Sequence, residues 1–393
     1  MSSAEPPDDR NPFEGWPMLG DLARLFSSRG PVNWDVARQT AQWIATEGKV
    51  EPNVDPLERM RMEELVRVAD LKVSDATGLS TSVAGGVLSV LPVTRGDWAM
   101  HSLEAYRPFL ENLAHALADS PDNESVGADP TTQLLGDLGK VLGPVLLGVQ
   151  SGYMLGHLSR RAFGQYDLLL PRPPADQLLM VPANLDAFTQ EWSLDADDLR
   201  MWVCLNEVTR HAVLGRPHVR ARLHTLVDEY VSRFEVNPDA FEASLTEMDP
   251  TDPSALQAVM GNPETLLGAI QTDAQREVLA KIQDLNAVIA GFVDHVLEEV
   301  GRRLVGSASM LTEALQRRRA ESTDGDRFAE RLLGLTLTAA QYERGANFIE
   351  GVVERAGDEG LRRLWHSDRE LPTTAEVDAA GLWLARIDLP EEG

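Results

Sequence analysis

Cysteine is almost missing from this chain of 393 residues, in which Cys204 is the single thiol. A lone cysteine cannot form an intrachain disulfide, and it cannot build a zinc site from several thiolates. Cys204 lies in the apolar stretch W-V-C-L. We therefore expect a buried, unreactive thiol rather than a nucleophile.

Positive charge is also scarce. Lys and Arg number 36 against 62 Asp and Glu, so the formal net charge is −26. A field of this sign repels nucleic acid and anionic lipid, so we exclude nucleic acid as a main partner of this acidic protein. The basic cluster Q-R-R-R at 316–319 is interpreted as a solvated helix face.

The N-terminus lacks a secretory signal. Residues 1–12 are acidic and rich in proline, without a basic stretch followed by an apolar one. We expect these residues to be disordered and the protein to be cytoplasmic.

A long apolar run suited to a membrane is missing as well. Residues 141–158 come closest, but they contain a proline, a glutamine, a histidine and four glycines. Three of the glycines, Gly148, Gly152 and Gly156, recur at every fourth position, a spacing that lets two helices approach closely. The segment is therefore predicted to be a buried core helix, with no membrane span.

Helical periodicity is what the chain has in abundance. Apolar residues at helical spacing predict helices over 34–48, 55–74, 98–118, 185–191, 195–214, 218–234 and 273–304. Short extended runs at 87–93 and 177–181 predict strands. The fold class is therefore mainly α with a few short strands, and the chain is long enough to bury a large core.

An acidic, turn-rich stretch at 119–130 is predicted to be an internal linker. It separates a helical region at 13–118 from a second helical region at 131–390. The second region carries a motif helix at 198–214 and a long second helix at 273–304. We expect both regions to form one compact unit.

The motif lies at 205–214, which reads L-N-E-V-T-R-H-A-V-L. Histidine at 206 and 210 would make it H-E-x-x-H, in which two histidines on one helix face hold zinc and the glutamate acts as general base. Asn206 and Arg210 stand at these ligand positions, while Glu207 stands at that of the base. Asn is a poor zinc ligand, and Arg brings a positive charge of its own.

A shifted set of ligands is the alternative. Glu207 and His211 are four residues apart and share a helix face, and the second helix offers Asp294, His295 and Glu298. The competing interpretation, which we favour, makes His211 a surface or capping histidine and the acidic residues a solvated helix face.

Glu207 and Arg210 are also three residues apart and could pair. If both side chains are buried, the arginine could take the metal's place as the charge partner of the glutamate.

Four longer stretches carry a family resemblance, at 17–39, 95–110, 155–171 and 331–357. Through them the chain resembles an actinobacterial family of zincin-like proteins that are described as zinc-dependent metalloproteases or hydrolases. The resemblance runs from Pro12 to about Pro390, and it implies a zincin-like metallopeptidase fold.

The resemblance also implies site residues. Members with an intact site look like L-H-E-V-T-H at 205–210, so Glu207 matches the general base while Asn206 and Arg210 replace two ligands. The third ligand is a glutamate in a motif like L-L-E-G-H-A-D. This motif matches V-I-A-G-F-V-D at 288–294 and puts Ala290 at the ligand position.

With all three ligands replaced, we predict a degenerate, non-catalytic pseudoenzyme with a binding or regulatory role and no cofactor. Its partner would be a peptide or protein in the former substrate cleft, added to a strand edge at 177–181. One alternative is an active zinc-dependent peptidase or hydrolase with shifted ligands and Glu207 as base. A second is a structural partner of an intact paralogue.

Overall fold

The computed structural model describes residues 30–118, 130–168, 170–233, 272–320 and 337–389. The expected disordered segment 1–12 and almost all of the expected linker lie outside these ranges. The division of the chain into two regions that form one unit stays a prediction.

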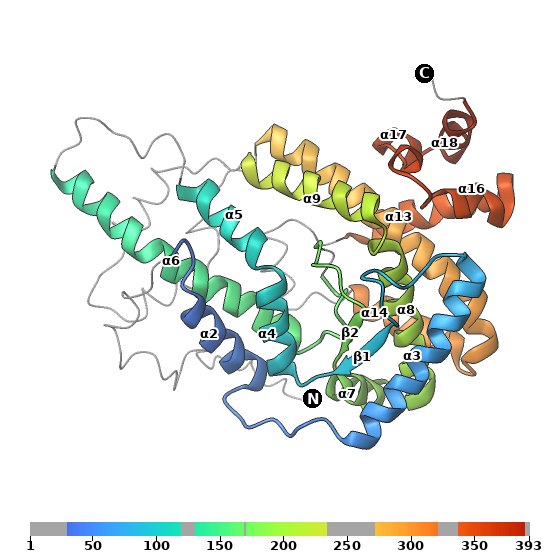
Figure 1. Ribbon diagram of the computed structural model, residues 1–393, viewed down its shortest axis with the longest axis horizontal. Coiled ribbons are helices and arrows are strands. Elements are labelled where there is room, and N and C mark those ends of the chain that lie inside the picture. The colour runs from blue at the N-terminus through green and yellow to red at the C-terminus, as the bar shows by residue number, and fades with distance from the viewer. Residues whose placement is uncertain (1–29, 119–129, 169, 234–271, 321–336, 390–393) are drawn as a thin grey trace, which may run out of the picture.

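Helices dominate the described residues (Figure 1). They are α2 (Trp34–Thr46), α3 (Pro56–Thr77), α4 (Arg95–Ala105), α5 (Arg107–Ala118), α6 (Pro130–Ser159), α7 (Pro182–Trp192), α8 (Ala196–Leu214), α9 (Pro217–Ser232), α13 (Asp273–Leu304), α14 (Ala308–Ala320), α16 (Ala339–Arg363), η3 (Asp368–Glu370), α17 (Thr374–Val377) and α18 (Ala380–Ile387). Two short strands, β1 (Ser89–Pro92) and β2 (Gln177–Met180), complete the set. The predicted fold class, mainly α with a few short strands, is confirmed.

Local signals explain where several helices begin. The Asn33 side chain accepts a hydrogen bond from the Val36 N–H and caps α2. The helix α13 begins with a capping box, in which Thr272 and Gln275 each satisfy a main-chain N–H of the other. Such reciprocal capping fixes the first residue of a helix, and α13 covers the range predicted for it.

The structure has two helices, α4 and α5, where the sequence predicts one. The expected helix over 98–118 is broken at Tyr106, where α4 ends and α5 begins. Pro108 has no N–H to bond the carbonyl of Glu104, so the helical ladder cannot continue through this point. The first of the two helices also starts earlier than predicted, after the side-chain cap of Thr94.

The sheet consists of β1 and β2 in parallel, with Ser89 opposite Gln177 and Pro92 opposite Met180. The strand β2 lies at an edge of this two-stranded sheet, as the sequence predicts, but that edge is partly covered. On the side away from β1, Met180 forms an antiparallel bridge with Gly164, and the Val181 N–H donates to the Phe163 carbonyl at 2.9 Å. At residues 180 and 181, the side of β2 that faces away from β1 is therefore already paired within the chain.

The helix α8 lies in the core, where it packs against α3 and α13 (Figure 1). Most of its residues are buried, from Leu199 to Leu214. A helix that is covered on most sides has neighbours that fix its rotation about its own axis. The functional residues of α8 are therefore held in place by packing on several faces.

In two helix pairs, glycine residues allow the two backbones to approach closely. A Cβ atom on Gly291 of α13 would lie 2.5 Å from the carbonyl oxygen of Gly345 on α16. In the other pair, a Cβ on Gly148 of α6 would lie 2.5 Å from the Asn33 carbonyl, and Gly152 and Gly156 face the backbone of α2 in the same way. The predicted buried core helix is confirmed for this part of α6. None of the helices in the described ranges is long and apolar enough to cross a membrane.

Replacing Gly152 by alanine tests this close approach, with Gly301 of α13 as the control. A methyl group at 152 would overlap the Ala37 carbonyl, whereas a Cβ at 301 meets nothing within 4 Å. We expect Gly152→Ala to lower the free energy of unfolding by about 1–3 kcal/mol. Gly301→Ala should raise it by up to about 1 kcal/mol, since alanine favours helix. Urea denaturation measures both, and equal stabilities would contradict the packing.

Candidate functional site

The site centres on Glu207, whose side chain is 2% exposed in the middle of α8. Its Oε2 atom accepts hydrogen bonds from the main-chain N–H groups of Gln165 at 2.9 Å and Tyr166 at 3.1 Å. A Cβ atom on Gly164 would overlap the Glu207 carboxyl group. Glycine at 164 therefore permits the loop to approach the glutamate this closely.

The loop at 163–167 is itself held on several sides. The Asp167 carboxylate accepts from the N–H groups of Phe163 at 2.6 Å and Gly164 at 3.1 Å. The Trp98 indole donates to the Gly164 carbonyl at 2.8 Å, and the Arg318 guanidinium lies over the Phe163 ring. These contacts come from α4 and α14, so the loop that binds Glu207 is a fixed part of the fold.

Burial raises the pKa of Glu207 to about 8. The nearby negative charge of Asp167 adds to this effect, while the positive charge of Arg210 and the two main-chain N–H groups oppose it. A carboxyl group with this pKa is mostly protonated at pH 7. It lies near the pH range in which a side chain exchanges protons most effectively.

The two positions that flank Glu207 in the motif are bonded to each other. The Arg210 Nε donates to the Asn206 Oδ1 at 3.2 Å, and Arg210 is 7% exposed. The predicted direct pairing of Arg210 with Glu207 is not found: within the described part of the chain, no ion pair of 4.0 Å or less joins them. The arginine acts on the glutamate at longer range, where its charge lowers the pKa.

Ala290 is fully buried on α13, in a small apolar cluster with Ala287, Leu337 and the ring of Tyr342. The guanidinium of Arg319 lies 4.9 Å from the centre of that ring. A methyl group at 290 therefore packs among apolar atoms and offers no metal ligand.

The acidic residues of α13 are engaged elsewhere. Asp294 accepts two hydrogen bonds from Arg319, both at 2.7 Å, and Glu298 pairs with Arg302 on the exposed side of the helix. His295 is half-buried. Asp294 is thus partly exposed and also joins α13 to α14, while Glu298 lies on the solvated face as expected.

The interpretation of the basic cluster at 316–319 as a solvated helix face holds for only part of it. Arg319 pairs with Asp294, and Arg318 stacks on Phe163 and donates to the Arg161 carbonyl. Arg317 alone of the three keeps a mostly exposed side chain, paired with Glu313. The error arises because the partners of Arg318 and Arg319 are distant in sequence.

His211 is not a surface histidine, because it is 2% exposed. Its Nδ1 atom lies 2.8 Å from the Tyr166 hydroxyl, and burial lowers the pKa of the ring. Glu207 and His211 thus meet the same loop segment, through the main chain and the side chain of Tyr166. No third ligand joins them: among the residues that the structure describes, no group of three His, Cys, Asp or Glu side chains could hold a metal.

Cys204 lies one turn before Glu207 and is fully buried, as predicted. Its Sγ atom is 3.9 Å from the sulfur of Met180, and burial raises the pKa of the thiol. A protonated thiol without access to solvent is a packing group rather than a nucleophile.

The residues that motif analysis missed are Gln165, Tyr166 and Asp167. They lie in a loop, without helical or strand periodicity, and no short catalytic motif contains them. Their single sequence signal is their place inside the stretch 155–171, one of the four that carry the family resemblance.

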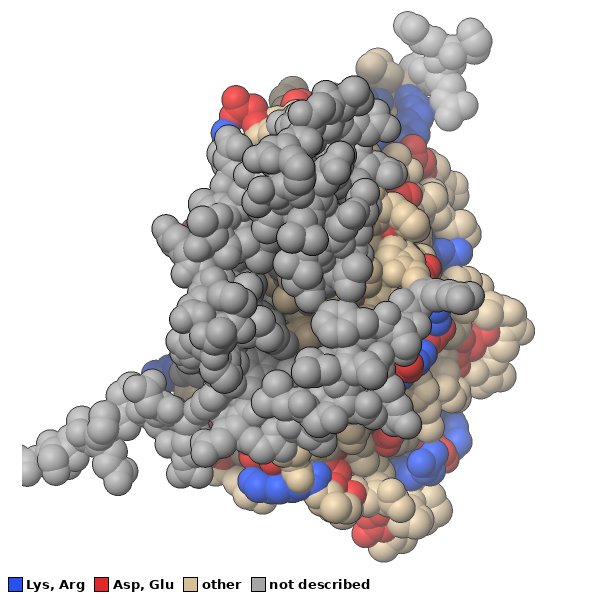
Figure 2. Space-filling view, turned by 90° about the vertical axis from the view of Figure 1, so that its left-hand side faces the viewer, with Lys and Arg blue, Asp and Glu red and all other residues tan. Residues whose placement is uncertain are grey.

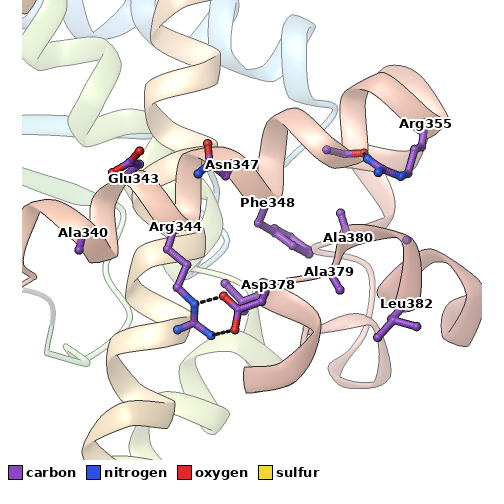
Figure 3. Close-up of a pocket in the computed structure, with 13 residues that line it drawn as sticks. Ala340, Glu343, Arg344, Asn347, Phe348, Arg355, Asp378, Ala379, Ala380 and Leu382 are labelled. Atoms are coloured by element: carbon purple, nitrogen blue, oxygen red, sulfur yellow. Dashed lines mark hydrogen bonds and ion pairs between the residues drawn. The ribbon is translucent and has the colours of Figure 1, made fainter.

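A separate cavity of about 730 Å³ lies between α16, α17 and α18 (Figure 3). Its most prominent polar group is Arg344, which points toward Asp378 and donates to its Oδ2 at 2.9 Å and to the Thr374 carbonyl at 2.8 Å. The same guanidinium bonds Asp284 on α13. These mutual contacts tie the C-terminal helices to α13, so we assign this network to the fold rather than to chemistry.

Comparisons with known proteins place the chain in a structural context. A family model described as "Zincin-like metallopeptidase" matches residues 32–384. A crystal structure from Chloroflexus aurantiacus, described as that of a suggested hydrolase with a novel fold, is similar with a TM-score of 0.66 at 23% sequence identity. The alignment covers 92% of this chain and 100% of the other. No curated protein matches the chain.

The raised pKa of Glu207 predicts a pH dependence of stability. Because the folded-state pKa of about 8 lies above the ordinary value of 4.5, folding takes up a proton between these values. This group should therefore lower the free energy of unfolding as the pH rises from 5 to 8, by up to about 1.4 kcal/mol per pH unit. Glu207→Gln keeps an oxygen acceptor and removes the titration.

Urea denaturation of both proteins at several pH values measures this difference. The variant should gain stability relative to the wild type as the pH rises. Parallel curves for the two proteins would show that Glu207 has an ordinary pKa.

Arg210→Ala should lower the free energy of unfolding by about 1–3 kcal/mol, since it removes a packed side-chain stem and leaves the Asn206 amide without this donor. Arg222 on α9 is exposed and serves as the control: Arg222→Ala should change stability by less than about 0.5 kcal/mol. Thermal unfolding and urea titration check both. A negligible effect at 210 would mean that the guanidinium contributes nothing to the fold.

Proposed function

The chain belongs to the zincin-like metallopeptidase family, and we propose that it is a member that binds rather than cleaves. In this proposal the protein is a non-catalytic binding or regulatory protein with a degenerate zinc site. The observation that carries it is the hydrogen bond between Arg210 and Asn206, which joins the two positions where the family motif places histidines.

The three ligand positions do not fit zinc. The guanidinium of Arg210 stays protonated and carries the same charge as the metal. Asn206 offers a neutral amide whose oxygen already accepts from that guanidinium. Ala290 has no donor atom, and its neighbours are apolar. No step of a reaction is therefore assigned to a metal at these positions.

The state of Glu207 supports the same conclusion. A general base must reach the water or group whose proton it takes. The Glu207 carboxyl is 2% exposed and accepts two main-chain hydrogen bonds through Oε2. These contacts give it a structural task, which is to hold the loop at 163–167 against α8.

The rival is an active zinc peptidase or hydrolase with shifted ligands, and one observation favours it. Burial gives Glu207 a pKa of about 8, near the value that suits a proton carrier at neutral pH. His211 approaches the same loop. Zinc would still need a third ligand from outside these two residues.

The zinc content of the purified protein distinguishes the non-catalytic protein from the active zinc enzyme. We expect the untagged protein, purified without chelators, to contain no stoichiometric zinc by elemental mass spectrometry. The triple variant Asn206→His/Arg210→His/Ala290→Glu is the matched control, because it restores all three ligands of the family motif and should take up zinc. Stoichiometric zinc in the wild type that disappears in Glu207→Ala and in His211→Ala would overturn the proposal.

A further inference from the structure

A second cavity, of about 500 Å³, lies on the other side of the loop that binds Glu207. Gln165 and Tyr166 form part of its wall, together with His211 and the C-terminal end of α8. The remaining walls come from the junction of α4 and α5, from the proline-rich segment 170–175 and from α9. Its size suits a small organic molecule or the end of a peptide.

The charge of this cavity is opposite to that of the protein. The described residues that line it include three arginines, Arg107, Arg172 and Arg220, and a single carboxylate, Glu104. The chain as a whole carries a formal net charge of −26. An anion would be attracted to this positive cavity, although the chain as a whole repels anions.

One of the three arginines is neutralised within the protein. The Arg107 Nε donates to the Glu111 carboxylate at 3.0 Å, and its guanidinium lies over the Trp34 ring. This side chain therefore belongs to the packing between α2 and α5.

The other two arginines have no carboxylate partner in the described ranges. Arg172 donates only to neutral oxygens, the Tyr106 hydroxyl and the Gln165 carbonyl, both at 3.2 Å. The Nη1 atom of Arg220 is buried and makes no hydrogen bond to any described group. A buried charged donor without a partner costs free energy, so an arrangement of this kind is suited to a partner that arrives from outside.

The histidine in the same wall is already bonded within the protein. His211 is 2% exposed, and its Nδ1 atom is 2.8 Å from the Tyr166 hydroxyl. The main chain of Thr81 is a second hydrogen-bond partner of the ring. The groups of this cavity that could hold an anion are therefore Arg172 and Arg220.

The rest of the lining is apolar. It includes Val83, Leu170, Leu179, Leu214 and Leu223, with several prolines. Inorganic anions gain nothing from such walls, whereas an organic anion buries its apolar part there. The planar guanidinium group matches a carboxylate with two parallel hydrogen bonds.

We propose that this cavity binds a carboxylate on an apolar body, with Arg172 and Arg220 holding the carboxylate and the leucine side chains holding the body. The site is distinct from the Asn206–Arg210 positions, and the proposal does not depend on whether zinc binds there. A free apolar acid and the C-terminus of a peptide with an apolar last residue share this chemistry.

Isothermal titration calorimetry on the full chain tests the proposal with two matched probe pairs. The first pair is 3-phenylpropionate and its neutral amide. The second is N-acetyl-Leu-Leu with a free C-terminus and the same peptide with a C-terminal amide. We expect an acid of at least one pair to bind at least ten-fold more tightly than its amide, and the pair that responds identifies the source of the carboxylate.

Variants assign the binding to the cavity. Arg172→Gln and Arg220→Gln should each weaken the binding of that acid at least ten-fold. Arg222→Gln, on the exposed side of α9, should leave it unchanged. Circular dichroism shows whether each variant is folded, and the comparison of acid with amide on the wild type needs no variant.

Three results would overturn the proposal. They are no binding of either acid at millimolar concentration, equal binding of acid and amide, and unchanged affinity in both folded Arg172→Gln and Arg220→Gln. Inorganic phosphate is included as a further probe. If phosphate bound as tightly as the acids, the apolar walls would contribute nothing, which would also overturn the proposed ligand class.

Discussion

The contact between the Glu207 carboxyl and the main chain of Gln165 and Tyr166 is the constraint on which the site depends. It requires a glycine at 164, since any side chain there would overlap the carboxyl group. It also places the Tyr166 hydroxyl beside His211. The same loop bridges β2 through Gly164, so one buried carboxyl group links the central helix to the edge of the sheet. Burial in turn raises the pKa of that group.

Three arginine side chains lie around this contact. Arg210 lies on α8 and lowers the pKa of Glu207 from a distance, while Arg318 and Arg319 reach the loop and α13 from α14. Arg318 lies over the Phe163 ring, and Arg319 pairs with Asp294. Positive charge is thus supplied beside these carboxylates by side chains that cannot lose their protons.

Sequence alone predicted the elements whose signals are local. The helix α13 has a capping box and a 3.6-residue period, and its predicted bounds agree with the structure. The break at Tyr106 was missed because the apolar pattern continues through it, and the effect of Pro108 on the helical hydrogen bonds was not considered. The burial of His211 could not be predicted, since its partner Tyr166 is 45 residues away in the chain. For the same reason the bonding of Arg319 escaped prediction, and the assignment of Ala290 to a ligand position stays an expectation from resemblance.

The motif residue Glu207 and the second cavity both adjoin the loop at 163–167. The Gln165 N–H donates to Glu207, and the Gln165 carbonyl accepts from Arg172, which lines the cavity. A ligand carboxylate that binds Arg172 would therefore compete with that carbonyl for the guanidinium. In the non-catalytic member that we propose, Glu207 keeps a role, because the loop it holds forms a wall of the second site.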